Sequence, residues 1–206
     1  MSGFQDPQNT WNQRFAQADY LFGQAPNQYL QQQAAHLQPG RALAVADGEG
    51  RNGVWLAEQG LAVDAFDFSS VALDKARALA HDRGVQVHWV CSDWQHFDWQ
   101  PGAWDNVVAI FIQFATPAER EQLFARMHKS LKPGGTLVIQ GYGHEQLRYN
   151  TGGPGKREHL YDEALLLQAF AGYEVLDLRT YEADLAEGCG HHGRSALVGL
   201  TARKPL

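Results

Sequence analysis

The sequence contains little cysteine and no long apolar run, and each shortage excludes a class of protein. Only Cys91 and Cys189 occur among the 206 residues, so the chain has no disulfide framework. No apolar run approaches the roughly 20 residues that a membrane-spanning helix needs. The first residues also lack the basic segment followed by an apolar one that marks an export signal. These absences predict a cytoplasmic protein without a membrane partner.

Positive charge is also in short supply. The chain has 17 Lys and Arg residues against 23 Asp and Glu residues, which gives a formal net charge of -6. A phosphate backbone repels a protein with this balance unless a local basic patch exists, and the sequence shows none. We therefore expect no nucleic-acid partner. The sequence does not indicate an oligomeric state.

From about residue 40, short apolar runs alternate with amphipathic segments, a pattern that predicts β-α units around a parallel sheet. We expect strands at residues 42–46, 61–66, 85–91, 104–111, 136–140, 174–178 and 195–200. We expect helices at residues 51–59, 71–83, 117–131 and 161–171. Thr116 followed by Pro117, and Ser69 or Ser70 before the second helix, are residues that typically begin a helix.

No helical pattern separates the last two expected strands, so they are predicted to form a long hairpin that contains one antiparallel strand. The expected fold is α/β, a Rossmann-like doubly wound sheet of seven mostly parallel strands, the last antiparallel, with helices on both faces. Residues 1–206 would form a single domain. Residues 1–38 are expected to form a helical segment that covers the ligand site at the carboxyl edge, and residues 39–206 the sheet core.

A glycine-rich turn follows the first expected strand, in the stretch ALAVADGEGRNG. Gly48, Gly50 and Gly53 fit the dinucleotide pattern G-x-G-x-x-G, although other nucleoside cofactors use similar turns. Glycine lets the backbone approach a ligand that a Cβ would exclude, and ligands of doubly wound sheets lie outside the carboxyl ends of the strands. The alternative is that any tight turn from strand to helix favours glycine.

Carboxylates follow the next two expected strands. Asp67 ends the second strand, where it would accept hydrogen bonds from both ribose hydroxyls of an adenosine. Asp93 follows the third strand, where it would accept from the adenine amino group while Trp94 packs against the ring. Each residue alone is more often a helix cap or a solvated turn residue. Together with the glycine turn, they predict one adenosine site shared by three strand ends.

Longer motifs at these positions resemble the class I S-adenosylmethionine-dependent methyltransferases over nearly the whole chain. VDAFDFSSVALDKARALA resembles that superfamily's second-strand motif, SDW its third-strand motif and LKPGGTLVIQGY its fifth-strand motif. GEGRNGVWLA, the N-terminal WNQRF and DYLFGQAPNQYL, TGGP and EGCGHHG resemble a bacterial branch close to the tellurite-resistance-type methyltransferases. The resemblance implies S-adenosylmethionine as cofactor and methyl transfer as the activity.

The resemblance also implies which residues bind the cofactor. They are Tyr20, Asp47, Gly48, Gly50, Asn52, Asp67, Phe68, Ser69, Asp93 and Trp94. The first motif departs from the superfamily, because Ala44 occupies the usual acidic position and Ala46 the position of the first glycine. Asp47 is the candidate replacement at the methionine end of the cofactor, where Tyr20 and Asn27 are further candidates. Tyr20 and Asn27 could equally pack one helix on another.

Methyl transfer is an in-line displacement, so the main task of the protein is to place the acceptor. A thiolate or a metalloid oxyanion needs little acid-base help, whereas an alcohol or amine needs a base. His191 and Tyr142 are the catalytic candidates, and His191 ranks first because it aligns with the histidine of the branch's EG..H.G pattern. The alternative is a loop histidine that bonds to the backbone. Cys189, His191 and His192 do not predict a metal site, because adjacent histidines point apart in an extended chain.

Two other functions fit parts of the pattern. The literal G-x-G-x-x-G and Asp67 would suit a nicotinamide-dependent reductase, but neither a second domain nor a Tyr-x-x-x-Lys pair accompanies them. A non-catalytic adenosine-cofactor sensor would keep the site and lack turnover. After the fourth strand, IFIQFATP lacks the Asn/Asp-Pro-Pro-Tyr turn of methyltransferases that modify nucleobase or glutamine nitrogens. We therefore predict a small-molecule acceptor, with a thiol or a metalloid oxyanion as the expected kinds.

Overall fold

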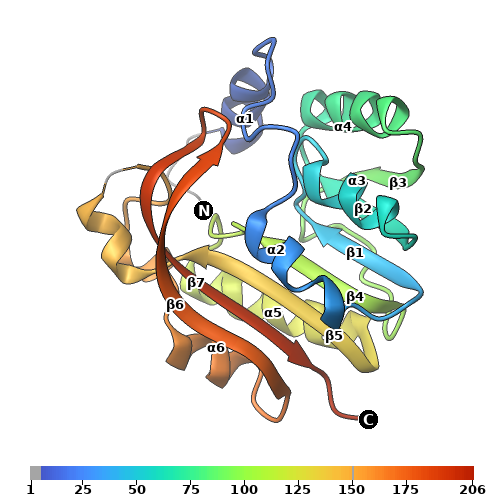
Figure 1. The fold of residues 1–206 in the computed structure, drawn as a ribbon, viewed down its shortest axis with the longest axis vertical. Coiled ribbons are helices and arrows are strands. Elements are labelled where there is room, and N and C mark those ends of the chain that lie inside the picture. The colour runs from blue at the N-terminus through green and yellow to red at the C-terminus, as the bar shows by residue number, and fades with distance from the viewer. Residues whose placement is uncertain (1–5, 150) are drawn as a thin grey trace.

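The computed structural model describes residues 6–149 and 151–206, which form one sheet with helices on both sides (Figure 1). The strands are β1 (Arg41–Val45), β2 (Ala62–Asp67), β3 (Val87–Cys91), β4 (Trp104–Ile110), β5 (Leu131–Tyr142), β6 (Glu174–Glu187) and β7 (His191–Arg203). Their order across the sheet is β3-β2-β1-β4-β5-β7-β6. β7 runs antiparallel to both of its neighbours, so the other six strands share one direction. The predicted α/β fold with one antiparallel strand is confirmed.

Helices cover both faces of this sheet. They are α1 (Pro7–Phe15), α2 (Gln28–Gln32), α3 (Arg51–Glu58), α4 (Ser70–Asp82), α5 (Pro117–Ser130) and α6 (Glu163–Ala169). Ala42 and Ala44 of β1 pack with side chains of α2 and α3, whereas the alternate residues Leu43 and Val45 pack with those of α5 and α6. Strands covered on both faces need apolar residues throughout, as the sequence has. None of the helices in the described part of the chain is long and apolar enough to cross a membrane.

Local capping signals begin the helices that follow β2 and β4. The Ser69 hydroxyl accepts a hydrogen bond from the Ala72 N–H and caps α4. The Thr116 and Glu119 side chains form a reciprocal capping box at the start of α5, with Pro117 in its first turn. These caps place the first turns of α4 and α5 shortly after the carboxyl ends of the strands.

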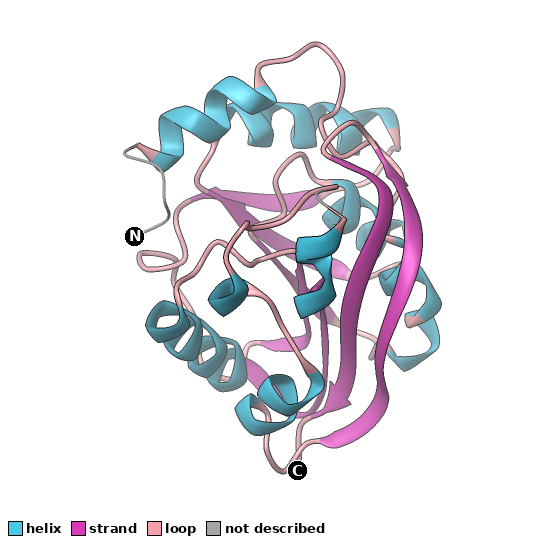
Figure 2. Ribbon diagram, turned by 90° about the vertical axis from the view of Figure 1, so that its left-hand side faces the viewer, coloured by secondary structure: helices cyan, strands magenta, loops and turns pink. Residues whose placement is uncertain are grey.

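The final hairpin is longer than its apolar runs predict. β6 and β7 stay paired as far as Glu187 and His191, well beyond the expected strands 174–178 and 195–200. The distal part of β6 is polar and half-exposed on an edge strand, so it has no apolar run to mark it. The hairpin curves away from the body of the sheet and carries its tip toward α1 (Figures 1 and 2).

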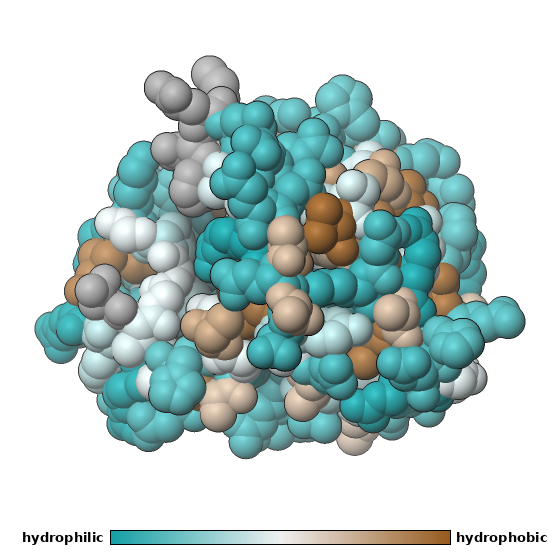
Figure 3. Space-filling view, turned by 90° about the horizontal axis from the view of Figure 1, so that it is seen from above, coloured by the Kyte–Doolittle hydropathy of each residue, from teal (hydrophilic) through white to brown (hydrophobic). Residues whose placement is uncertain are grey.

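The N-terminal segment lies over the carboxyl ends of β1 and β2. Gln8 donates a hydrogen bond to the Phe68 carbonyl at 2.9 Å, and Asn12 accepts one from the Ser69 hydroxyl at 2.5 Å. Phe15 is buried beside the turn that follows β1. Hydrophilic side chains predominate on the face where α1 and the hairpin tip lie, with apolar ones scattered among them (Figure 3). Access to these strand ends is therefore bordered by the N-terminal segment.

Candidate functional site

The carboxyl ends of β1, β2 and β3 lie side by side, because these strands are neighbours in the sheet. The Asp47 N–H donates to the Phe66 carbonyl at 3.1 Å, and the Ser92 N–H donates to the Asp67 carbonyl at 3.0 Å. The structure therefore brings the three segments that carry Asp47, Asp67 and Asp93 to one edge of the sheet.

The turn after β1 uses its glycines in two ways. Gly48 has a φ of 59° and Gly50 a φ of 89°, both in the left-handed region that favours glycine. A Cβ on Gly50 would lie 2.6 Å from the Ala76 Cβ, so this glycine also lets α3 pack closely on α4. Ala46, at the position of the superfamily's first glycine, has a φ of 49° and bears the strain that a glycine would avoid. The turn is therefore tight even where the motif departs from its usual residues.

Asp67 is a buried carboxylate with unused acceptor capacity. One oxygen accepts a hydrogen bond from the Gly48 N–H at 3.0 Å, and the other accepts one from the Ser69 N–H at 2.9 Å. A carboxylate has about four lone-pair sites, and the Phe68 N–H also favours the ionised form, so acceptor capacity remains for at least one further donor. Burial raises the pKa of Asp67 to about 6, although the backbone hydrogen bonds favour the ionised form. The group can therefore receive a hydrogen bond from a ligand.

Asp47 lies within the same turn and adds a second carboxylate. Its Oδ2 accepts a hydrogen bond from the Gly53 N–H at 2.9 Å. Loss of hydration raises the pKa of Asp47 to about 7, and the nearby Asp67 charge acts in the same direction. Two carboxylates that resist ionising together favour a cationic ligand, since its charge offsets their repulsion.

Asp93 and Trp94 follow β3 and are already engaged by the protein. Asp93 Oδ1 accepts hydrogen bonds from the Gln95 and His96 N–H groups at 2.8 and 2.9 Å. Partial burial opposes ionisation of Asp93, but the His96 side chain and these backbone bonds outweigh it and lower the pKa. The Trp94 ring is buried in the core, 5.3 Å from the Arg126 guanidinium. A contact of either side chain with adenine stays a prediction.

The other predicted cofactor residues make contacts within the protein. The Tyr20 hydroxyl donates to a backbone carbonyl of α4 at 3.1 Å. Asn52 accepts a hydrogen bond from the Asn27 N–H at 2.9 Å. Ser69 caps α4, and both Ser69 and Phe68 bond to α1. The structure thus places Asn52, Phe68 and Ser69 next to the strand ends and packs Tyr20 against α4.

The two catalytic candidates meet where β5 ends and β7 begins. The His191 ring contacts Phe22 and Phe111 at centroid distances of 4.3 and 4.2 Å, and Tyr142 meets it edge-on at 5.7 Å. Burial lowers the pKa of His191 and raises that of Tyr142, so both rings are neutral near pH 7. A Cβ on Gly153 would lie 2.6 Å from the Tyr142 ring, so this glycine loop packs directly on the tyrosine. An enclosed neutral tyrosine can donate a hydrogen bond but is poorly suited to act as a base.

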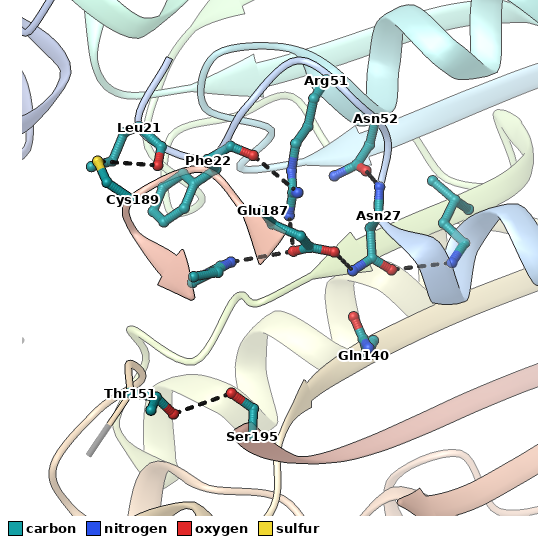
Figure 4. Close-up of polar contacts among 12 residues, drawn as sticks. Leu21, Phe22, Asn27, Arg51, Asn52, Gln140, Thr151, Glu187, Cys189 and Ser195 are labelled. Carbon is teal, nitrogen blue, oxygen red and sulfur yellow. Dashed lines mark hydrogen bonds and ion pairs between the residues drawn. The ribbon is translucent and has the colours of Figure 1, made fainter. Parts of the chain in front are cut away.

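Charged residues that the sequence analysis did not select connect the two ends of the site. Arg51 and Glu187 form an ion pair at 2.8 Å, with side chains only 6% and 11% exposed. Glu187 also accepts a hydrogen bond from Asn27 Nδ2 at 2.9 Å (Figure 4). Nδ1 of His191 lies 3.4 Å from Glu187 Oε2. We call Asn27, Arg51, Glu187 and His191 the ionic clasp, which joins the N-terminal segment, the start of α3 and the hairpin tip.

Glu49 forms a second set of contacts that hold the N-terminal segment in place. Its buried carboxylate accepts a hydrogen bond from the Leu21 N–H at 2.8 Å and pairs with Lys75 Nζ at 2.7 Å. Glu49 and Arg51 lie within the glycine motif, so their place in that motif was the sequence signal that could have identified them as site residues. Glu187 opens the EGCGHHG motif, which was the available signal, but an acidic residue in an expected loop usually faces solvent and the motif was used only to select His191.

The strand order, the glycine turn and the buried carboxylates are typical of α/β domains that bind nucleosides. Residues 42–135 match the family described as the methyltransferase domain. A demethylmenaquinone methyltransferase of Thermus thermophilus is 33% identical over 103 residues, which is 49% of this chain and 46% of the relative. The tRNA N(3)-cytidine methyltransferase METTL2 of Gallus gallus is 31% identical over 103 residues, 46% of this chain and 28% of the relative. The chain spans less than half the length of these curated relatives.

Solved structures share the fold over more of the chain. The N-methyltransferase NodS from Bradyrhizobium japonicum WM9, in complex with S-adenosyl-L-homocysteine, superimposes with a TM-score of 0.74 at 15% identity, over 97% of this chain and 98% of that one. TehB from Haemophilus influenzae gives a TM-score of 0.72 at 15% identity, over 96% of this chain and 66% of that one. Residues 42–135 thus resemble a methyltransferase domain, and the solved structures share the fold of the chain, in agreement with the predicted methyltransferase.

Proposed function

We propose that this chain is an S-adenosylmethionine-dependent methyltransferase that acts on a small molecule. The observation that carries the proposal is Asp67, a buried carboxylate with remaining acceptor capacity beside the glycine turn. The hydroxyls of a ribose would donate to this carboxylate. The methionine end of the cofactor is cationic, and its charge would allow Asp47 and Asp67 to ionise together. Asp93 and Trp94 would hold the adenine.

His191 is the first candidate on the acceptor side, with the Tyr142 hydroxyl as a hydrogen-bond donor near it. The cofactor supplies an activated methyl group, and the task of the chain is to align the acceptor with that group and to exclude water. The rings around His191 provide an enclosed apolar wall. The glycine loops 151–155 and 188–193 would shape the acceptor pocket, and residues 1–38 would cover the bound cofactor.

A small molecule suits the charge of the chain better than a nucleic acid does. The net charge is -6, and the sequence has no basic run that would hold a phosphate backbone. The EGCGHHG and TGGP motifs support the tellurite-resistance-type branch, and with it a thiol or a metalloid oxyanion as acceptor.

Calorimetric titration with S-adenosylmethionine, S-adenosylhomocysteine and NADH tests the cofactor. We expect both adenosyl compounds to bind and NADH not to bind, whereas preferential binding of NADH would identify a reductase. A panel of thiols and metalloid oxyanions, followed by the release of S-adenosylhomocysteine, tests turnover. Tight cofactor binding without turnover on any acceptor would identify a sensor and refute the enzymatic proposal.

A further inference from the structure

We propose that Glu187 positions His191 as a general base, and that the acceptor therefore carries a removable proton, as a thiol, a hydroxyl or an amine does. This inference rests on the proposed methyltransferase function and selects among its acceptors. It disfavours a metalloid oxyanion, because the metalloid atom would attack with a lone pair that carries no proton, so no base is needed.

Glu187 is held in place by side chains from two distant parts of the chain and lies beside the nearby His191. Oε2 accepts a hydrogen bond from Arg51 Nη2 at 2.8 Å, and Oε1 accepts one from Asn27 Nδ2 at 2.9 Å. Oε2 also lies 3.4 Å from His191 Nδ1. Burial opposes ionisation, but these partners outweigh it and lower the pKa of Glu187 to about 2. The carboxylate is therefore charged throughout the neutral range.

The imidazole of His191 is neutral, and its Nδ1 lies beside the Glu187 carboxylate. Burial lowers its pKa, Arg51 and Arg14 act in the same direction, and Glu187 acts against them. A neutral imidazole carries one N–H, and a carboxylate beside Nδ1 favours the tautomer with the proton on that atom. The lone pair then lies on Nε2. In the described part of the chain the buried Nδ1 makes no hydrogen bond, and Glu187 Oε2 is the carboxylate oxygen that lies near it. The 3.4 Å contact is longer than a hydrogen bond, as is common in catalytic sites without substrate.

The protons and the charges balance in the proposed methyl transfer. The acceptor's lone pair forms a bond to the methyl carbon while the carbon–sulfur bond breaks, which turns a sulfonium into a neutral thioether. His191 Nε2 takes the acceptor's proton, so the positive charge passes from sulfur to the imidazolium. Glu187 stabilises that imidazolium through the proton on Nδ1, and the ring later returns a proton to water. The pair of Glu187 and His191 would have no role with an acceptor that has no proton to give.

The substitution Glu187→Gln tests the positioning role, because it removes the charge and keeps the size of the side chain. Glu182→Gln is the matched control, since Glu182 lies on the same strand and pairs with Arg194 at 2.8 Å on an exposed surface. Nitrogen NMR of His191 reports its tautomer and pKa without turnover. We expect the wild type and the control to keep the proton on Nδ1. In Glu187→Gln, the tautomers should mix and the pKa of His191 should fall further.

Methyl transfer to dithiothreitol, catechol and a primary amine, with selenite as the oxyanion probe, tests the acceptor class. We expect transfer to at least one protic probe, and a loss of at least tenfold in Glu187→Gln with less than a twofold change in S-adenosylhomocysteine affinity. An unchanged His191 tautomer in an active Glu187→Gln variant would overturn the positioning role and leave the proposed function intact. Transfer to selenite alone would overturn the protic acceptor. Failure of the wild type to bind S-adenosylmethionine would remove the proposed function and this inference together.

Discussion

Lowering the pH from 8 to 5 should protonate Asp67 in the free protein, because burial raises the pKa of this carboxyl to about 6. A protonated carboxyl has fewer acceptor positions, so it should accept hydrogen bonds from a ribose poorly while it serves the backbone N–H groups of Gly48, Phe68 and Ser69. Binding of the cofactor then requires the proton to leave. The affinity should therefore rise with pH until the free carboxyl is ionised.

The size of this effect follows from the pKa. At pH 5, one unit below that value, about ten molecules in eleven hold Asp67 protonated, which weakens binding about tenfold, or about 1.4 kcal/mol. At pH 6, binding should release about half a proton from this residue. At pH 8, where the carboxyl is ionised, Asp67→Ala should weaken binding by about 1 to 3 kcal/mol, the usual range for hydrogen bonds to a charged group.

Calorimetry at pH 5, 6 and 8, in buffers of different ionisation enthalpy, gives both the affinity and the number of protons released. Asp67→Asn should remove the half proton at pH 6, and Asp47, with a pKa of about 7, accounts for the pH dependence that remains. Asp74→Asn is a suitable control, because Asp74 is a 77% exposed carboxylate on α4. The same pH dependence in the wild type and in Asp67→Asn would refute the role of Asp67.

Three further changes test other parts of the site. His191→Ala should lower turnover and spare cofactor affinity in kinetics and calorimetry, and a parallel loss of both would make its role structural. Gly50→Ala should destabilise the fold by about 2 to 4 kcal/mol in chemical denaturation, because its Cβ would overlap α4, whereas Gly60→Ala meets open space and should cost about 1 kcal/mol. Equal losses would show that packing is not the cause. Arg51→Met should destabilise by about 3 to 5 kcal/mol by leaving Glu187 buried and unpaired, and adding Glu187→Met should recover most of that loss. A double variant as unstable as Arg51→Met would contradict this account.

Apolar strands and capping residues made most of the fold predictable. β1, β2 and β4 lie within a residue or two of their expected ranges, because buried runs bounded by glycines and helix caps leave few alternatives. The distal hairpin gave no comparable signal. Its pairing relies on backbone hydrogen bonds between polar segments, and these leave little trace in side-chain hydrophobicity.

The candidate site, like the fold, could be predicted only in part from the sequence. Asp67 could be predicted, because its place at the end of a strand follows from local sequence and the strand order brings it to the glycine turn. The ionic clasp could not, because Asn27 and Glu187 lie 160 positions apart and no local pattern pairs them. The fit of Gly50 against Ala76 likewise depends on how two helices pack, which the turn sequence alone does not specify.

The family match ends at residue 135, before the distal hairpin begins. Asp47 and Asp67 belong to the matched part, whereas Glu187 and His191 belong to the part that follows. The hairpin could therefore vary in sequence while the matched part of the chain stays the same. The ion pair of Arg51 with Glu187 and the ring contact of Phe111 with His191 both join the hairpin to the matched part, so a redesigned hairpin must keep these contacts or replace them.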